Sequence, residues 1–188
     1  MFRFCINIFL VASLFSISSF NKEDRVKWRS KDNYSSIYLE SLNYLDNNNL
    51  EMYILSLNNI ISSSKNNLLI MNSYYDLGQI YLSRYKDYYL AVDNFNYILN
   101  NSFSNTLKPL NLDIKDSLEL KEKSLFMIAY IYFNHIGNLT LSLKFYTLFL
   151  DRYPNNELSS SVKYEIDLIN KELKNFNKGI KNGINKWL

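Results

Sequence analysis

Two segments of the chain, residues 74–103 and 125–154, repeat one pattern at an offset of 51 residues. In each segment a small residue is followed thirteen positions later by another small residue, and an aromatic residue comes four positions after that. Small side chains let two helices approach closely, and the aromatic fills the space beside them. The repeat therefore predicts that one helical hairpin occurs twice. The matched positions are Gly78, Ala91 and Phe95 in the first segment and Ala129, Ser142 and Tyr146 in the second.

The scarcity of turn residues supports a fold made only of helices. The 188 residues include 4 glycines and 2 prolines, too few for the turns of a many-stranded sheet. The spacing of apolar residues and the polar breaks between them predict an all-α chain. The repeat is interrupted by an insert at 104–119, where Pro109 predicts a loop and Asp113 or Asp116 is expected to cap the fifth helix. The expected helices cover residues 35–46, 50–64, 67–85, 88–100, 113 or 116 to 135, 139–152 and a last stretch around 162–173.

The repeated residues resemble the tetratricopeptide repeat (TPR), whose first helix carries an aromatic, Leu-Gly and Tyr, and whose second carries Ala, an aromatic and Pro. Both copies have one extra residue between their helices, and residues 35–64 resemble a degenerate first copy. The resemblance implies a right-handed superhelix of antiparallel hairpins with a C-terminal capping helix. The matching residues are Tyr74, Leu77, Gly78, Tyr81, Ala91, Phe95, Ala129, Tyr132, Ser142, Tyr146 and Pro154.

The ending of the second copy, residues 149–158, resembles repeats of bacterial envelope proteins such as the BamD-type outer-membrane assembly lipoproteins and the cell-division coordinator of the Tol–Pal system. This resemblance implies a scaffold or adaptor of the cell envelope, located in the periplasm, that binds a protein or peptide. The partner itself is not specified by the sequence.

The N-terminus has the features of a secretory signal peptide. Arg3 precedes an apolar run of about 17 residues that ends near Phe20, and Ser18 and Ser19 offer cleavage positions. We expect a signal peptide at 1–19, a linker at 20–33, a TPR-like helical repeat domain at 34–175 and a basic tail at 176–188. The alternative is an N-terminal helix that stays uncleaved and anchors a structural subunit of an envelope complex in the membrane.

In the TPR family the first helix of each hairpin lines a concave groove that binds the partner. Carried over by position, this implies an aromatic and amide-rich groove, while core packing remains the competing explanation for its aromatic residues. The groove residues are predicted to be Asn72, Tyr75, Gln79, Leu82 and Ser83 in one hairpin and Lys123, Phe126, Tyr130, Phe133 and Asn134 in the next.

The basic tail allows two interpretations. Apolar residues from Leu173 to Trp187 recur every three or four positions among lysines, so a helix here would be basic and amphipathic and suited to peripheral contact with a membrane. Gly179 and Gly183 each cost about 1 kcal/mol of helix relative to alanine. We therefore expect a frayed, solvated tail.

The residue inventory favours a non-catalytic protein. The single histidine, His135, is expected near a helix end beside Gly137, where it suits a cap better than a base. No spacing of metal ligands, phosphate-binding loop or nucleophile motif occurs in the sequence. The net charge of +3 is too mild and dispersed to indicate nucleic-acid binding. We expect no enzyme activity, no cofactor and no metal.

Overall fold

The computed structural model describes residues 33–101 and 111–184, with the side chains at 33–35, 111–116 and 180–184 left out of the description. This part of the chain is helical and contains no strand, as predicted. None of its helices is both long and apolar enough to cross a membrane. The predicted signal peptide and most of the linker lie outside the described residues, as does the first part of the insert. The helices are α3 Asn33–Asp46, α4 Leu50–Ser63, α5 Asn67–Ile80, η1 Tyr81–Tyr85, α6 Tyr88–Asn100, α7 Asn111–Ile131, η2 Tyr132–Ile136, α8 Leu139–Arg152 and α9 Ser159–Ile184.

Polar residues between the helices cap their N-termini. The side chains of Asn49, Asn66, Asp87 and Asn138 each accept a hydrogen bond from a backbone N–H in the first turn of the helix that follows. Such a bond satisfies one of the amide groups that the helix itself leaves without a partner. The asparagine-rich connections therefore fix where α4, α5, α6 and α8 begin.

The two predicted hairpins have the same connection between their helices. The first helix of each ends in a π-helical turn, η1 or η2, and a residue in the left-handed conformation follows: Lys86 at φ 54° or Gly137 at φ 75°. The next amide then bonds back to the carbonyl of Tyr81 or Tyr132, at 2.9 Å in both hairpins. A π-helical turn holds more residues than an α-helical one, which agrees with the extra residue predicted between the helices.

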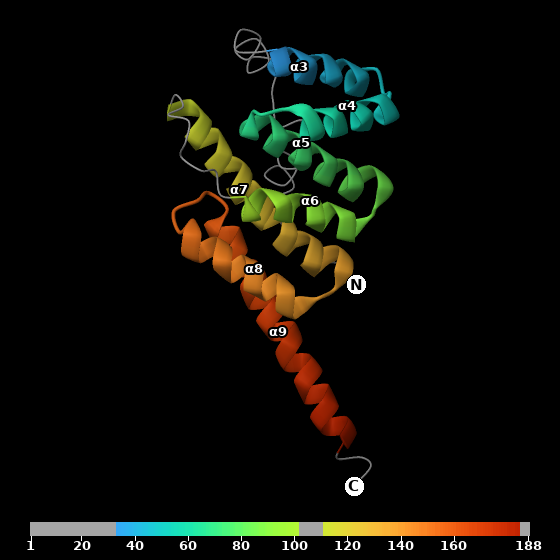
Figure 1. The fold of residues 1–188 in the computed structure, drawn as a ribbon. Helices are drawn as coiled ribbons and strands as arrows, with labels where there is room; N and C mark the ends of the chain where they lie inside the picture. Colours follow the sequence, from blue (N-terminus) through green and yellow to red (C-terminus); the bar gives the residue numbers. More distant parts are fainter. Residues whose placement is uncertain (1–32, 102–110, 185–188) are drawn as a thin grey trace. The chain divides into compact units, whose positions relative to one another are not determined.

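The helices form two compact units, described here separately. The N-terminal unit, whose last residue is Ser124, contains the α3/α4 and α5/α6 hairpins, with α4 packed on α5 (Figure 1). A buried acid joins its first three helices. The carboxylate of Asp76 on α5 accepts hydrogen bonds from the hydroxyls of Tyr38 on α3, at 2.5 Å, and Tyr53 on α4, at 2.6 Å.

The C-terminal unit begins at Leu125 and contains the end of α7, then η2, α8 and α9. Its core is aromatic: the ring of Phe126 meets the rings of Tyr146 and Phe149 edge to face, with centroids 5.9 and 6.0 Å apart. The predicted close approach of the two helices is present, because the Ser142 hydroxyl donates to the backbone carbonyl of Ala129 at 2.9 Å.

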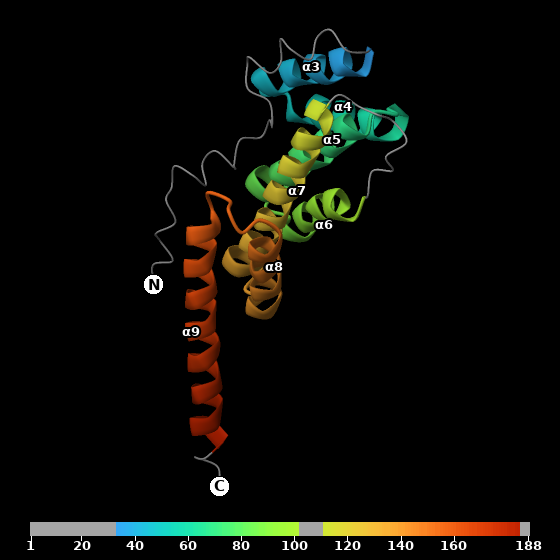
Figure 2. The ribbon, with the colours of Figure 1, turned by 90° about the vertical axis from the view of Figure 1, so that its left-hand side faces the viewer.

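Two expectations about helix ends need correction. The fifth helix, α7, begins at Asn111, so neither Asp113 nor Asp116 precedes it as a cap. The last helix continues through Gly179 and Gly183 to Ile184, where a frayed tail was expected (Figure 2). Once the first half of α9 is packed, each further residue adds a hydrogen bond without a new nucleation step, and this offsets the cost of the glycines.

Candidate binding surface

Six of the residues predicted to line a groove are buried, which corrects their assignment as an open contact surface. They are Asn72, Tyr75, Gln79, Leu82, Phe126 and Phe133. Aromatic and amide side chains at helical spacing fit a core as well as a groove when they bond internally. Asn72, for example, donates to the carbonyl of Leu68 one turn earlier on the same helix, at 2.8 Å.

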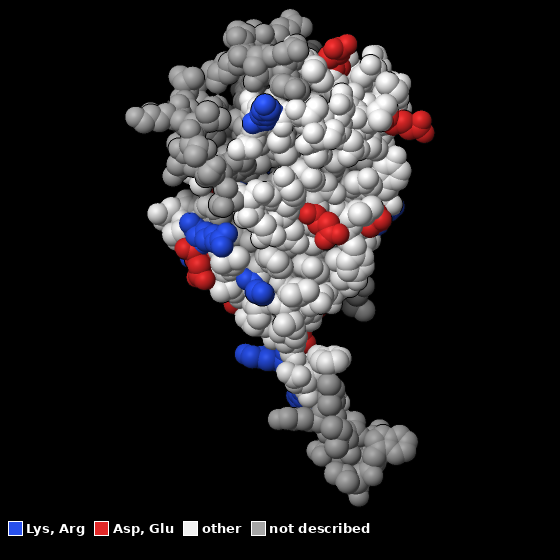
Figure 3. Space-filling model, viewed as in Figure 1, with Lys and Arg blue, Asp and Glu red and all other residues white. Residues whose placement is uncertain are grey.

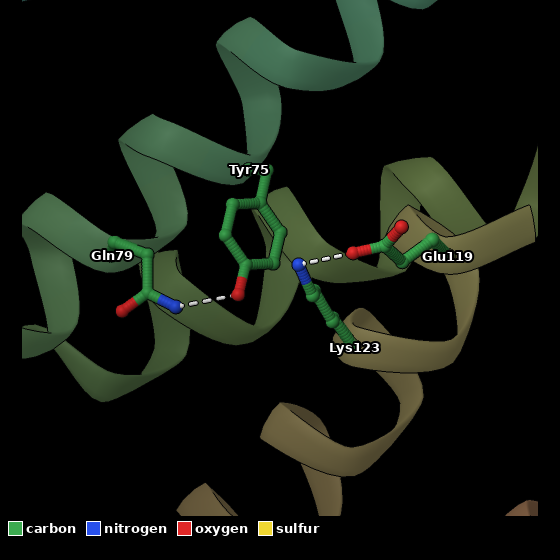
Figure 4. Close-up of polar contacts among 4 residues, drawn as sticks. All are labelled: Tyr75, Gln79, Glu119 and Lys123. Carbon is green, nitrogen blue, oxygen red and sulfur yellow. Dashed lines mark hydrogen bonds and ion pairs between the residues drawn. The ribbon is translucent and has the colours of Figure 1, made fainter. Parts of the chain in front are cut away.

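Figure 4 shows two of these residues beside the α7 residues of the N-terminal unit. The side-chain amide of Gln79 donates to the Tyr75 hydroxyl at 3.0 Å, and Lys123 forms an ion pair with Glu119 at 2.6 Å. Burial raises the pKa of the Tyr75 phenol, with a further contribution from the nearby carboxylates of Asp76 and Glu119. Tyr75 is therefore a neutral, hydrogen-bonded core residue.

The other predicted groove residues do not form one surface. Lys123 is partly exposed in the N-terminal unit and engaged with Glu119, and Ser83 is exposed in the middle of η1. Tyr130 and Asn134 are half-buried in the C-terminal unit, one turn apart, with the Tyr130 ring against His135. His135 itself lies exposed in the last turn of η2, and the cap residue is Gly137.

Most residues of the repeat pattern lie in the cores of the two units. Leu77, Gly78, Ala91 and Phe95 are buried in the N-terminal unit. In the C-terminal unit Ala129, Ser142 and Tyr146 are buried. Tyr74, Tyr81 and Tyr132 are half-buried, and Pro154 is exposed. The pattern therefore marks the packing of each hairpin and not a contact surface.

An exposed aromatic surface instead lies on the α5/α6 hairpin. The ring of Tyr74 on α5 stacks on that of Tyr97 on α6, with centroids 3.7 Å apart and planes 22° apart. Two turns earlier on α6, Tyr89 is 67% exposed, and Leu90 beside it is 42% exposed. We call Tyr74, Tyr89, Leu90 and Tyr97 the tyrosine face. The sequence of α6 indicated part of this face. Its buried stripe is formed by residues such as Ala91, Phe95 and Ile98, and the α6 members of the tyrosine face lie outside that stripe.

The tyrosine face is not needed to build the hairpin. At the matched positions, 51 residues later, the second hairpin has Thr140 for Tyr89 and Leu148 for Tyr97. It nevertheless has the same turn and the same close helix packing. On the face of the molecule seen in Figure 3, charged side chains are scattered, with wide uncharged areas between them. Large exposed aromatics that the fold does not require are typical of surfaces that bind a partner.

The C-terminal unit contains a buried acid. Glu165 on α9 is only 3% exposed, and burial raises the pKa of its carboxyl group to about 7. Its charge in turn raises the pKa values of Tyr130 and Tyr146, which burial has already raised. The three side chains come from α7, α8 and α9, so each of these helices contributes an ionisable group to this unit.

We expect the stability of the C-terminal unit to fall as pH rises from about 4.5 to about 7. In that interval folded Glu165 holds its proton and the unfolded chain releases it, so the free energy of unfolding declines by at most about 1.4 kcal/mol per pH unit. Thermal unfolding across this range should show the decline in the wild type and a flatter profile in Glu165→Gln. Equal slopes for the two proteins would contradict the assignment.

Among residues 33–101 and 111–184, no group of three or more His, Cys, Asp or Glu side chains is placed to hold a metal ion. No family model, curated protein or solved structure matches the chain. The functional inference therefore depends on the geometry of the helices and on the exposed residues they carry.

Proposed function

We propose that this chain is a non-catalytic scaffold of the TPR type that binds another protein or a peptide through the tyrosine face. The observation that carries the proposal is the exposure of Tyr89, Leu90 and Tyr97 on a helix whose counterpart in the other hairpin lacks these tyrosines. The tyrosine face takes the place of the predicted groove as the proposed site.

The TPR assignment is supported by the way each hairpin is built. Both have a small residue facing the second helix, an aromatic beside it and a wide turn ended by a left-handed residue. Hairpins of this kind stack in TPR proteins, and a helix such as α9 would then cover the open end. Scaffolds of this class act by presenting side chains on rigid helices.

The chemistry of the face suits an apolar or mixed peptide surface. Tyrosine contributes a large contact area with few rotatable bonds, and its hydroxyl keeps a hydrogen-bonding group at the rim. The Tyr74–Tyr97 stack holds two of the rings in place before a partner arrives, which reduces the ordering cost of binding.

The proposed setting is the bacterial cell envelope, reached by export. The apolar run that begins at Phe4 and ends near Phe20 and the serines at its end support a cleaved signal peptide. The same run supports the alternative, a structural subunit held in the membrane by an uncleaved N-terminal helix. The mass of the mature chain, with fractionation into soluble and membrane pools, distinguishes the two.

Crosslinking in intact source cells, followed by affinity capture and mass spectrometry, tests the binding site. We expect Tyr89→Ser with Tyr97→Ser to reduce recovery of specific partners at least about tenfold, as removal of central aromatics does at protein interfaces. The matched control is Tyr85→Ser with Tyr164→Ser, which removes two tyrosines that are 53% and 52% exposed and do not belong to the tyrosine face. Partners that survive the first pair, or that are lost equally with the control, would exclude the tyrosine face as the site.

A further inference from the structure

One apolar stripe runs along the whole of α9. Val162, Ile166, Ile169 and Leu173 follow one another at spacings of three and four, and Phe176, Ile180 and Ile184 continue the same spacing. Residues at these intervals share one side of an α-helix. The sequence of α9 therefore has the spacing of one apolar stripe from Val162 to Ile184.

The two halves of that stripe have different surroundings. In the first half Val162 and Ile169 are buried, and α9 packs against α8 within the C-terminal unit. From Lys174 to Gly179 every residue is exposed, and the ring of Phe176 is 66% exposed. Figures 1 and 2 both show the C-terminal part of α9 extending beyond α8. The packing of this unit thus uses half of an amphipathic helix.

Charge also differs between the halves. Residues 159–170 contain one lysine and two acids, whereas residues 171–184 contain four lysines and one glutamate. On a helical projection the lysines at 171, 174, 178 and 181 fall together on the side opposite the apolar stripe. An apolar stripe with a lysine-rich polar side opposite it is the pattern of helices that lie in the interface of a membrane with anionic lipids.

We propose that the C-terminal half of α9 binds the surface of an anionic lipid bilayer. Phe176 and the apolar positions in line with it would enter the boundary between headgroups and acyl chains, while the lysines contact anionic headgroups. This interaction is separate from partner binding by the tyrosine face, and either proposal can fail without the other.

The charge pattern favours a lipid surface over a second copy of the chain. Two copies paired along the apolar stripe would place side by side two helical segments that each carry four lysines and one glutamate in residues 171–184. Like charges brought together in this way oppose association. An anionic bilayer offers charge complementary to the lysines of the C-terminal half of α9.

Cosedimentation of the full chain with vesicles tests the proposal. We expect binding to phosphatidylcholine vesicles that contain about one third phosphatidylglycerol, weaker binding to pure phosphatidylcholine, and a loss of the difference at high salt. Each lysine near an anionic surface contributes about a fivefold change in partitioning, so Lys174→Gln with Lys178→Gln should weaken binding about 25-fold. Phe176→Ser should weaken it about fivefold or more, because it removes the exposed aromatic from the apolar stripe.

The matched control is Lys65→Gln with Lys86→Gln, which removes the same charge from two exposed lysines of the N-terminal unit and should leave binding unchanged. Circular dichroism of each variant checks that its helix content is retained. Equal binding to neutral and anionic vesicles, or equal binding by all variants, would assign the interaction to another part of the chain and overturn the proposal. It would also be overturned if vesicles were not bound and sedimentation equilibrium instead showed a dimer that Phe176→Ser dissociates.

Discussion

Replacing Asp76 with alanine is expected to lower the free energy of unfolding of the N-terminal unit by about 2–5 kcal/mol. The substitution leaves the hydroxyls of Tyr38 and Tyr53 buried without the oxygen to which both now donate. Each buried donor that loses its acceptor costs about 1–3 kcal/mol, and part of this is offset because a carboxylate no longer has to be buried. Urea unfolding followed by circular dichroism measures the change.

A double-mutant cycle isolates the hydrogen bonds from the general effect of a smaller side chain. We expect Tyr38→Phe and Tyr53→Phe each to cost about 1 kcal/mol in the wild type and much less when Asp76 is already alanine. If the costs simply add, the two tyrosines do not depend on Asp76. That result would contradict the role of this carboxylate in joining α3, α4 and α5.

Replacing Gly78 with alanine is expected to destabilise the same unit by about 1–3 kcal/mol, although alanine is the better helix former. A Cβ atom at this position would lie 2.8 Å from two ring carbons of Phe95, closer than atoms in a packed core approach. Phe95 is fully buried, so its ring has little room to move. Urea unfolding again provides the measurement.

The second hairpin supplies the control, because it has Ala129 at the matched position. Ala129→Gly should cost about 1–2 kcal/mol, because glycine is the poorer helix former and one buried methyl group is lost. Combining Gly78→Ala with Phe95→Leu should cost less than the sum of the two single changes, since the smaller side chain makes room for the new methyl group. A Gly78→Ala protein as stable as the wild type would show that the helices do not pack as closely as described.

Helix positions could be predicted well from the sequence because local signals determine them. The α5/η1 stretch, α6 and α8 have the expected bounds, and each begins after a capping Asn or Asp. The extent of α9 was wrong, since two glycines argued locally against a helix that is continuous with a packed first half. Local propensity and the effect of a packed neighbour compete there, and only the first is visible in the sequence.

The candidate site was harder to predict than the fold. Tyr75 and Phe126 have the spacing of groove residues and also the spacing of core residues, and their burial depends on what packs against α5 and α7. Asp76 stands next to Tyr75 in the sequence, yet its two tyrosine donors come from positions 38 and 53. Contacts between residues so far apart in the sequence depend on how the helices pack. The periodicity of one helix does not indicate which residues of another helix it contacts.

The matching turns at Lys86 and Gly137 bear on how such a chain changes over generations. Lys86 shares its left-handed conformation with Gly137, and Asp87 shares its capping role with Asn138, although neither pair is identical. Main-chain hydrogen bonds to the carbonyls of Tyr81 and Tyr132 define the turn, so several side chains satisfy it. Mutation can therefore remove most of the sequence similarity between two hairpins while each keeps its backbone conformation. The backbone would then still show a relationship that the amino-acid sequence no longer shows.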